Sequence, residues 1–161
     1  MIVKNKTIAA WLALLGGPFG MHRFYLYGSR DPAAWVLSFP SLLGLYGVWR
    51  ARQWGLDDLW SWLLMPMLGF TFAGCALTAI VYGLMDAQRW NSRFNAATAQ
   101  GDDDDDDGNG NGNGNGGTNW ITIGAVVLAL FFGTIALVAT LAFSLQRLFE
   151  YQVLPVALGR P

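Results

Sequence analysis

The sequence predicts an all-α integral membrane protein, with a helical hairpin followed by two further transmembrane helices. Two observations support this fold class. Only 13% of the 161 residues are charged while 53% are hydrophobic, whereas a soluble domain usually carries about 25% charged residues. The apolar residues also gather into four long stretches that are almost free of charge, as is typical of membrane-spanning helices. No alternating pattern typical of a membrane β-barrel accompanies them.

Residues 7–28 are the first predicted span, within a hairpin domain at 1–59. Thr7–Met21 carries no charge. At 1.5 Å per residue this segment reaches only about 22 Å, short of a hydrocarbon core of about 30 Å. To cross, the helix has to continue to about Gly28, which places His22 and Arg23 at the interface. The aromatic residues that follow them suit the headgroup boundary.

A turn is predicted between the first two spans, because Asp31 can cap a helix and Pro32 suits its first position. The second span covers residues 33–49, with a kink expected at Pro40. The third covers residues 59–85. Two carboxylates precede this third span and are interpreted as charges that cap its start, with an ion path as the alternative. They are Asp57 and Asp58.

Residues 86–119 are predicted to form a polar, flexible loop rich in Asp, Gly and Asn, because they have little apolar surface to bury. The run Asp102–Asp107 is interpreted as a solvated linker, with weak calcium binding as the alternative. A fourth span is predicted over residues 120–145. Residues 146–161 then form a short tail.

Four spans would place both termini on the same side of the membrane. Six basic residues then share the side of the termini and four lie on the other, which favours cytoplasmic termini in a bacterial inner membrane. The six are Lys4, Lys6, Arg50, Arg52, Arg147 and Arg160, and the four are Arg23, Arg30, Arg89 and Arg93.

Arg23 is the most constrained candidate residue, because its charge cannot be lost and is expensive to bury in lipid. It is expected to pair with a lipid phosphate or with one of the carboxylates Asp31, Asp57 and Asp58. His22 is the only histidine. It is interpreted as structural rather than as a proton relay or metal ligand, because zinc usually needs three or four protein ligands. Gly16 and Gly20 are four residues apart, so on one helix face they would permit close helix approach.

The stretch from Gly17-Pro18-Phe19-Gly20 through His22-Arg23-Phe24-Tyr25-Leu26 to Gly28 resembles the TM2 domain family. Members have a basic start, an Ala/Leu-rich helix, Gly-x-x-Gly before an Arg-Phe-Tyr-Leu element, and a second helix ending near an aspartate. The resemblance covers residues 4–59 and implies a small helical hairpin in a membrane, without a defined activity. The motif and interface residues it suggests are Gly16, Gly17, Gly20, His22, Arg23, Phe24, Tyr25, Gly28 and either Asp57 or Asp58.

The sequence contains no nucleophile–base pairing, phosphate loop or zinc motif. We therefore expect a non-enzymatic structural or protein-interaction module without a cofactor or metal, and identify no catalytic residue. Its expected partners are the lipid bilayer and either other membrane proteins or a second copy, with neither a nucleic acid nor an identified small-molecule substrate. A small oligomeric transporter or channel is the main alternative, and a membrane enzyme is a third.

Overall fold

The computed structural model describes residues 3–56, 58–96 and 116–157. All regular elements in this part of the chain are helical, and no strand occurs among the described residues. They are α1 (Lys6–Gly16), the 3-10 helix η1 (Gly17–Phe19), α2 (Met21–Tyr27), α3 (Pro32–Trp54), α4 (Leu59–Leu84), α5 (Ala87–Phe94) and α6 (Trp120–Ala157).

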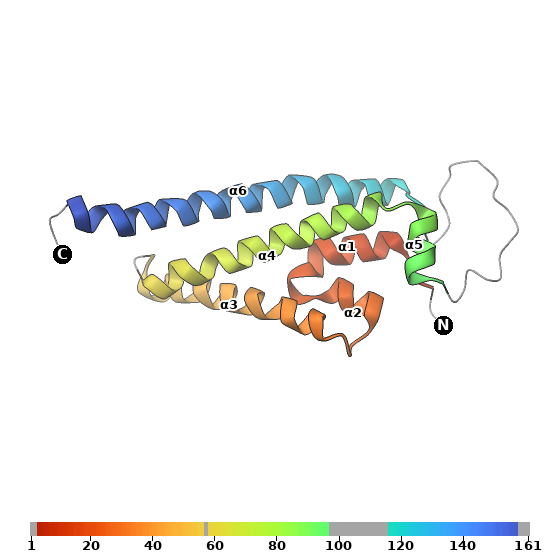
Figure 1. Ribbon diagram of the computed structural model, residues 1–161, viewed down its shortest axis with the longest axis horizontal. Helices are drawn as coiled ribbons and strands as arrows, with labels where there is room; N and C mark the ends of the chain where they lie inside the picture. Colours follow the sequence, from red (N-terminus) through yellow and green to blue (C-terminus); the bar gives the residue numbers. More distant parts are fainter. Residues whose placement is uncertain (1–2, 57, 97–115, 158–161) are drawn as a thin grey trace, which may run out of the picture.

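Helix α4 is the central element of the structure. Helix α6 lies along one side of α4, while α3 and the shorter α1 lie along the other side (Figure 1). The three long helices α3, α4 and α6 run alternately up and down the long axis, and the short α5 crosses one end of the bundle. The helices are therefore layered about α4, and the start of α1 also contacts α6.

The first predicted span is not one helix. Helix α1 ends at Gly16, and η1 leads to Gly20, whose φ of +72° is left-handed and favours glycine. A Cβ at Gly20 would lie 2.5 Å from the carbonyl oxygen of Ala34 in α3, so the close approach of α3 also requires glycine. Helix α2 then returns beside α1 (Figure 1). Residues 7–28 thus form a hairpin of short helices, because the backbone reverses at Gly20.

This reversal changes where the ends of the chain lie. The start of α1 lies beside the start of α6, since Thr7 Oγ1 is 2.6 Å from Thr122 Oγ1. Near its other end, α6 contacts the start of α4, where the rings of Trp62 and Tyr151 are 6.2 Å apart. The start of α1 and the end of α6 are therefore at opposite ends of the bundle (Figure 1). The expected arrangement of four full spans with both termini on one side does not match this topology.

The remaining elements follow the predicted order with two differences. Asp31 caps α3 by accepting a hydrogen bond from Ala33 N, and Asp58 caps α4 by accepting one from Ser61 N. Helix α5 lies within the predicted loop 86–119, because Asp86 caps it and Trp90 is buried. Helix α6 continues beyond residue 145 to Ala157, so much of the predicted tail extends the helix. The Asp102–Asp107 run lies outside the described residues.

Small residues allow α4 to approach α6 closely. Gly69, Ala76 and Gly83 recur every seven residues along one stripe of α4. They face Thr140, Gly133 and Val126 of α6, which also recur every seven residues in the opposite chain direction. A stripe without bulky side chains lets helix backbones pack closely in a membrane, where van der Waals contact drives helix association.

Two helices among the described residues are long and apolar enough to cross a membrane. They are α4 and the segment Trp120–Gln152 of α6, with mean hydropathies of 1.9 and 2.6 in their most apolar windows. Only 17% and 22% of these windows are buried, whereas the core helix of a soluble protein is mostly buried. Their outward surfaces are therefore apolar as well.

Substitution at Gly133 tests the α4–α6 packing. A Cβ at this position would lie 2.7 Å from the Cβ of Ala76, so Gly133→Ala forces the helices apart. We expect it to destabilise the fold by about 1–3 kcal/mol, the usual cost of overpacking. The measurement is thermal unfolding in detergent micelles, followed by circular dichroism.

Gly124→Ala provides the matched control on the same helix, because no atom lies within 4 Å of a Cβ built there. It should be neutral or stabilising by up to about 1 kcal/mol, since alanine favours helix more than glycine does. Equal destabilisation by the two substitutions would contradict close packing as the reason for glycine at position 133.

Candidate functional site

The candidate motif runs along the α1–α2 hairpin, from a turn against Cys75 in the middle of α4 back to the end of the bundle where α1 begins. Gly16 ends α1, and residues 17–28 make up the turn η1, helix α2 and the start of the α2–α3 connection. Asp58 lies at the opposite end, where it starts α4. Asp57 lies outside the described residues. The motif therefore forms one local unit without the carboxylate that follows α3.

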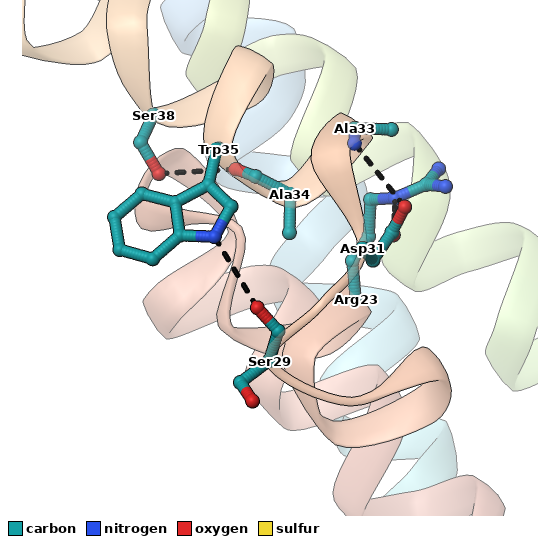
Figure 2. A network of polar contacts seen from close by, with 7 residues as sticks. All are labelled: Arg23, Ser29, Asp31, Ala33, Ala34, Trp35 and Ser38. Atoms are coloured by element: carbon teal, nitrogen blue, oxygen red, sulfur yellow. Dashed lines mark hydrogen bonds and ion pairs between the residues drawn. The ribbon is translucent and has the colours of Figure 1, made fainter.

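Arg23 pairs with Asp31, one of the carboxylates expected as its partner. The distance from Arg23 Nε to Asp31 Oδ2 is 2.8 Å (Figure 2). The Arg23 guanidinium lies 5.2 Å from the ring centre of Tyr27. Asp31 also accepts a hydrogen bond from Ala33 N, so one carboxylate joins α2 to the first turn of α3. The hydrogen bond from Arg23 is the main reason that the pKa of Asp31 is lowered.

Aromatic contacts tie the same turn together. The ring of Phe24 meets Trp35 of α3 edge-on at 5.4 Å. Trp35 Nε1 donates a hydrogen bond to the carbonyl oxygen of Ser29 (Figure 2). Gly28 ends α2 with a φ of +85° and donates its N–H to Phe24 O. Phe24 and Gly28 therefore position α3 rather than acting only as interface residues.

His22 lies against the end of α4. Its side chain is 3% exposed, and its ring centre is 6.1 Å from that of Tyr82. Its Nδ1 is buried and has no hydrogen-bond partner within the described parts of the chain. No group of three or more His, Cys, Asp or Glu residues that could hold a metal ion occurs in these parts. The surroundings of His22 thus supply packing contacts.

The glycines of the motif contact different helices. Gly16 ends α1 and Gly20 is left-handed, so the expectation that they share one helix face is wrong. A Cβ at Gly17 would lie 2.5 Å from the Cβ of Cys75 in α4. Gly17 therefore lets the turn approach α4, while Gly20 lets it approach α3.

A second polar cluster at this end includes residues that the sequence analysis did not assign to a site. Lys6 is fully buried, and its Nζ donates hydrogen bonds to Met85 O at 2.5 Å and to Thr118 Oγ1 at 2.6 Å. Burial lowers the pKa of Lys6, and the charge of Asp86 opposes this effect. Lys6 therefore links the start of α1 to the end of α4 and to the residues just before α6.

The residues beside Lys6 connect the N-terminal segment to α2 and α5. The carbonyl oxygen of Lys4 accepts hydrogen bonds from Trp90 Nε1 and Asn95 Nδ2, at 3.0 and 3.1 Å. The hydroxyl of Tyr25 accepts a hydrogen bond from Asn5 N at 2.9 Å, so this candidate interface residue is used inside the fold. The sequence signal that could have revealed α5 is the periodic spacing of polar residues over 87–94. The contacts that Trp90 and Asn95 make with Lys4 leave no local signal, because these residues are far apart in the chain.

At the opposite end, Arg50 and Asp58 form a bidentate pair. Arg50 Nε and Nη2 lie 2.6 and 3.0 Å from the two oxygens of Asp58. This pairing, followed by the hydrogen bond from the Ser61 hydroxyl, holds the pKa of Asp58 well below its usual range. The interpretation of Asp58 as a capping charge is confirmed by its hydrogen bond from Ser61 N.

Two apolar cavities lie along α6. The first, of about 340 Å³, lies between α4 and α6 and has Thr134 as its only polar side chain. The second, of about 450 Å³, is also lined by Val48 of α3 and has Thr140 as its only polar side chain. No ionisable side chain lines either of these two cavities. Both therefore suit hydrocarbon rather than ions.

No family model matches the chain, and the comparisons find no similar curated protein or solved structure. These comparisons leave the resemblance to the TM2 domain family as an expectation from residues 4–59. What the motif does is thus inferred from its own contacts, which fix the α1–α2 hairpin against α3 and α4.

The Arg23–Asp31 pair can be tested by a double-mutant cycle of Arg23→Gln and Asp31→Asn. Asp31→Asn removes the charge but keeps a side-chain oxygen that can cap α3. At low salt and neutral pH we expect each single variant to unfold a few degrees below the wild type and the double variant to lose little more. Thermal unfolding in detergent micelles measures these differences, which should shrink at high salt.

The same pair gives a pH dependence of known sign. Because the pKa of Asp31 is lower in the folded state than in the unfolded state, its contribution to stability is complete above about pH 4. The contribution is lost as the pH falls through the lowered folded-state pKa. A difference between wild type and Asp31→Asn that stays constant from neutral pH into this acidic range would refute the pairing.

Proposed function

We propose that this chain is an integral membrane protein of the TM2 type, located in a bacterial inner membrane, that serves as a non-enzymatic structural or protein-interaction module. The observation that carries the proposal is the apolar outward surface of α4 and α6, whose most apolar windows are only 17% and 22% buried. Large exposed side chains continue along α6, including Phe131 at 60% and Val138 at 58%. A contiguous apolar surface of this kind needs lipid or a partner.

The α1–α2 hairpin supports the membrane assignment. At 1.5 Å per residue, α1 is about 16 Å long, roughly half of a hydrocarbon core. Backbone that is not helical is tolerated at that depth only where protein satisfies its polar groups. Ser41 and Ser38 of α3 provide this at η1, by donating hydrogen bonds to Pro18 O at 2.5 Å and Phe19 O at 2.9 Å.

The distribution of basic residues supports an orientation with the α1 end in the cytoplasm. With α3, α4 and α6 alternating along the bundle, six basic residues fall at the end where α1 starts, and three described ones fall at the other. Loops rich in Lys and Arg stay on the cytoplasmic side. The six are Lys4, Lys6, Arg23, Arg30, Arg89 and Arg93, and the three are Arg50, Arg52 and Arg147.

The contacts of the motif support a structural role for it. Arg23 forms an ion pair with Asp31, and the Tyr25 hydroxyl accepts a hydrogen bond from Asn5 N. The backbone of Gly17 packs closely against Cys75. These contacts fix the hairpin, and they leave the outward face of α6 as the larger surface available to a membrane partner. An oligomeric transporter or channel remains the alternative outcome of the experiments that follow.

Cysteine accessibility tests the membrane assignment and its orientation. In a Cys75→Ala background, Ser92→Cys and Gln53→Cys place single thiols at the two ends of the bundle, both at exposed positions. An impermeant maleimide added to intact spheroplasts should label position 53 and should label position 92 only after lysis. Equal labelling of both positions in intact cells would contradict the orientation, and release of the protein by a carbonate wash would contradict membrane integration.

A photo-crosslinking amino acid at Val138 tests the interaction role. We expect ultraviolet light to give a discrete adduct with one membrane protein or with a second copy, because this exposed position lies on the outward face of α6. A crosslinker at buried Ala129 is the matched control and should give no intermolecular adduct. Lipid adducts alone would argue against an interaction module, and ion flux in proteoliposomes would favour the channel.

A further inference from the structure

Three exposed arginines lie at the end of the bundle where α1 starts, and none has a carboxylate partner within the described residues. Two of them, Arg89 and Arg93, are four residues apart and so lie on one side of α5. The third, Arg30, belongs to the α2–α3 turn. Trp90, between the two arginines of α5, is fully buried, so the helix has one anchored side and one basic side.

Aromatic packing holds these segments next to one another. The ring of Tyr27, at the end of α2, meets the ring of Phe94, at the end of α5, at 6.1 Å. Phe94 also contacts Trp90 at 4.5 Å, which fixes the helix that carries the arginines. The α2–α3 turn and α5 therefore present their arginines from adjacent positions. We call Arg30, Arg89 and Arg93 the basic end.

The opposite end of the bundle differs in how its arginines are used. Arg50 pairs with Asp58 and Arg147 pairs with Glu150, at 2.6 and 2.8 Å. Arg52 is exposed there and forms no ion pair among the described residues. Among the described residues, the basic end thus has three arginines without a carboxylate partner and the opposite end has one. The basic end therefore attracts an anionic surface more strongly.

We propose that the basic end binds the phosphate groups of anionic phospholipids in the cytoplasmic leaflet. This inference rests on the proposed membrane location. Helix α4, with 26 residues, is about 39 Å long and exceeds a hydrocarbon core of about 30 Å, so α5 follows it at headgroup depth. The planar guanidinium donates paired hydrogen bonds to phosphate, and anionic lipids give the cytoplasmic leaflet its negative potential.

Arg23 is left out of the basic end because Asp31 already neutralises it. The sequence also places six carboxylates, Asp102–Asp107, between α5 and α6, outside the described residues. Their charge opposes the binding of an anionic lipid. The experiment therefore uses the full chain and includes a variant in which these six residues are asparagine.

The test is a titration of the purified full-length protein in a neutral detergent with phosphatidylglycerol or phosphatidylcholine, with bound lipid counted by native mass spectrometry. The variants are Arg30→Gln, Arg89→Gln, Arg93→Gln and their combination. Arg52→Gln is the matched single-charge control at the other end. We expect the wild type to prefer phosphatidylglycerol and each basic-end variant to weaken that binding about fivefold, as expected for a basic residue near an anionic surface.

The combined variant should lose the preference for phosphatidylglycerol, whereas Arg52→Gln should retain it and the asparagine variant should bind at least as well as the wild type. Equal binding of both lipids by the wild type, an equal loss in Arg52→Gln, or weaker binding by the asparagine variant would each overturn the inference. Wild-type protein that resists a carbonate wash but shows no lipid preference would overturn this inference alone. Protein released by that wash would overturn the proposed membrane location itself.

Discussion

The arrangement of this protein depends on how closely other backbones can approach α4. On one side, the small residues Gly69, Ala76 and Gly83 meet a matching stripe of α6. On the other side α3 supplies the small residues, since its Gly44 and Gly47 lie against Leu68 and Leu64 of α4. In the proposed membrane location, apolar burial would distinguish poorly between helix surfaces, so this fit of backbone against side chain would select the neighbours of α4.

The reversal at Gly20 decides how the second side of α4 is covered. It confines α1 to the half of α4 near its C-terminus, through Ala13 and Ala79, while α3 covers the other half. The serines of α3 accommodate the irregular backbone of the turn by binding its carbonyl oxygens. A single left-handed glycine thus changes the first segment from a crossing into a hairpin and moves the two ends of the chain apart.

The long helices could be predicted from the sequence because their signals are local: uncharged runs of residues, Asp31 before Pro32, and a carboxylate before Ser61. The sequence does not predict the break at residues 17–20, because the uncharged run Thr7–Met21 favours one helix that continues to about Gly28. The sequence leaves Arg23 with either a lipid phosphate or one of three carboxylates as its partner, and Asp31 is the nearest of these carboxylates in the chain. The cluster around Lys6 could not be predicted, because its partners lie 79 and 112 residues away.

Lys4 and Lys6 also fix the two flanks of the chain between α5 and α6. The carbonyl oxygen of Lys4 accepts a hydrogen bond from Asn95, just after α5, and Lys6 Nζ donates one to Thr118, just before α6, so neighbouring residues of the N-terminal segment hold both flanks. The entropy of closing a loop between two ends changes only slowly with the length of the loop. We therefore expect a domain or an affinity tag inserted between Ala96 and Gly116 to leave the described bundle intact.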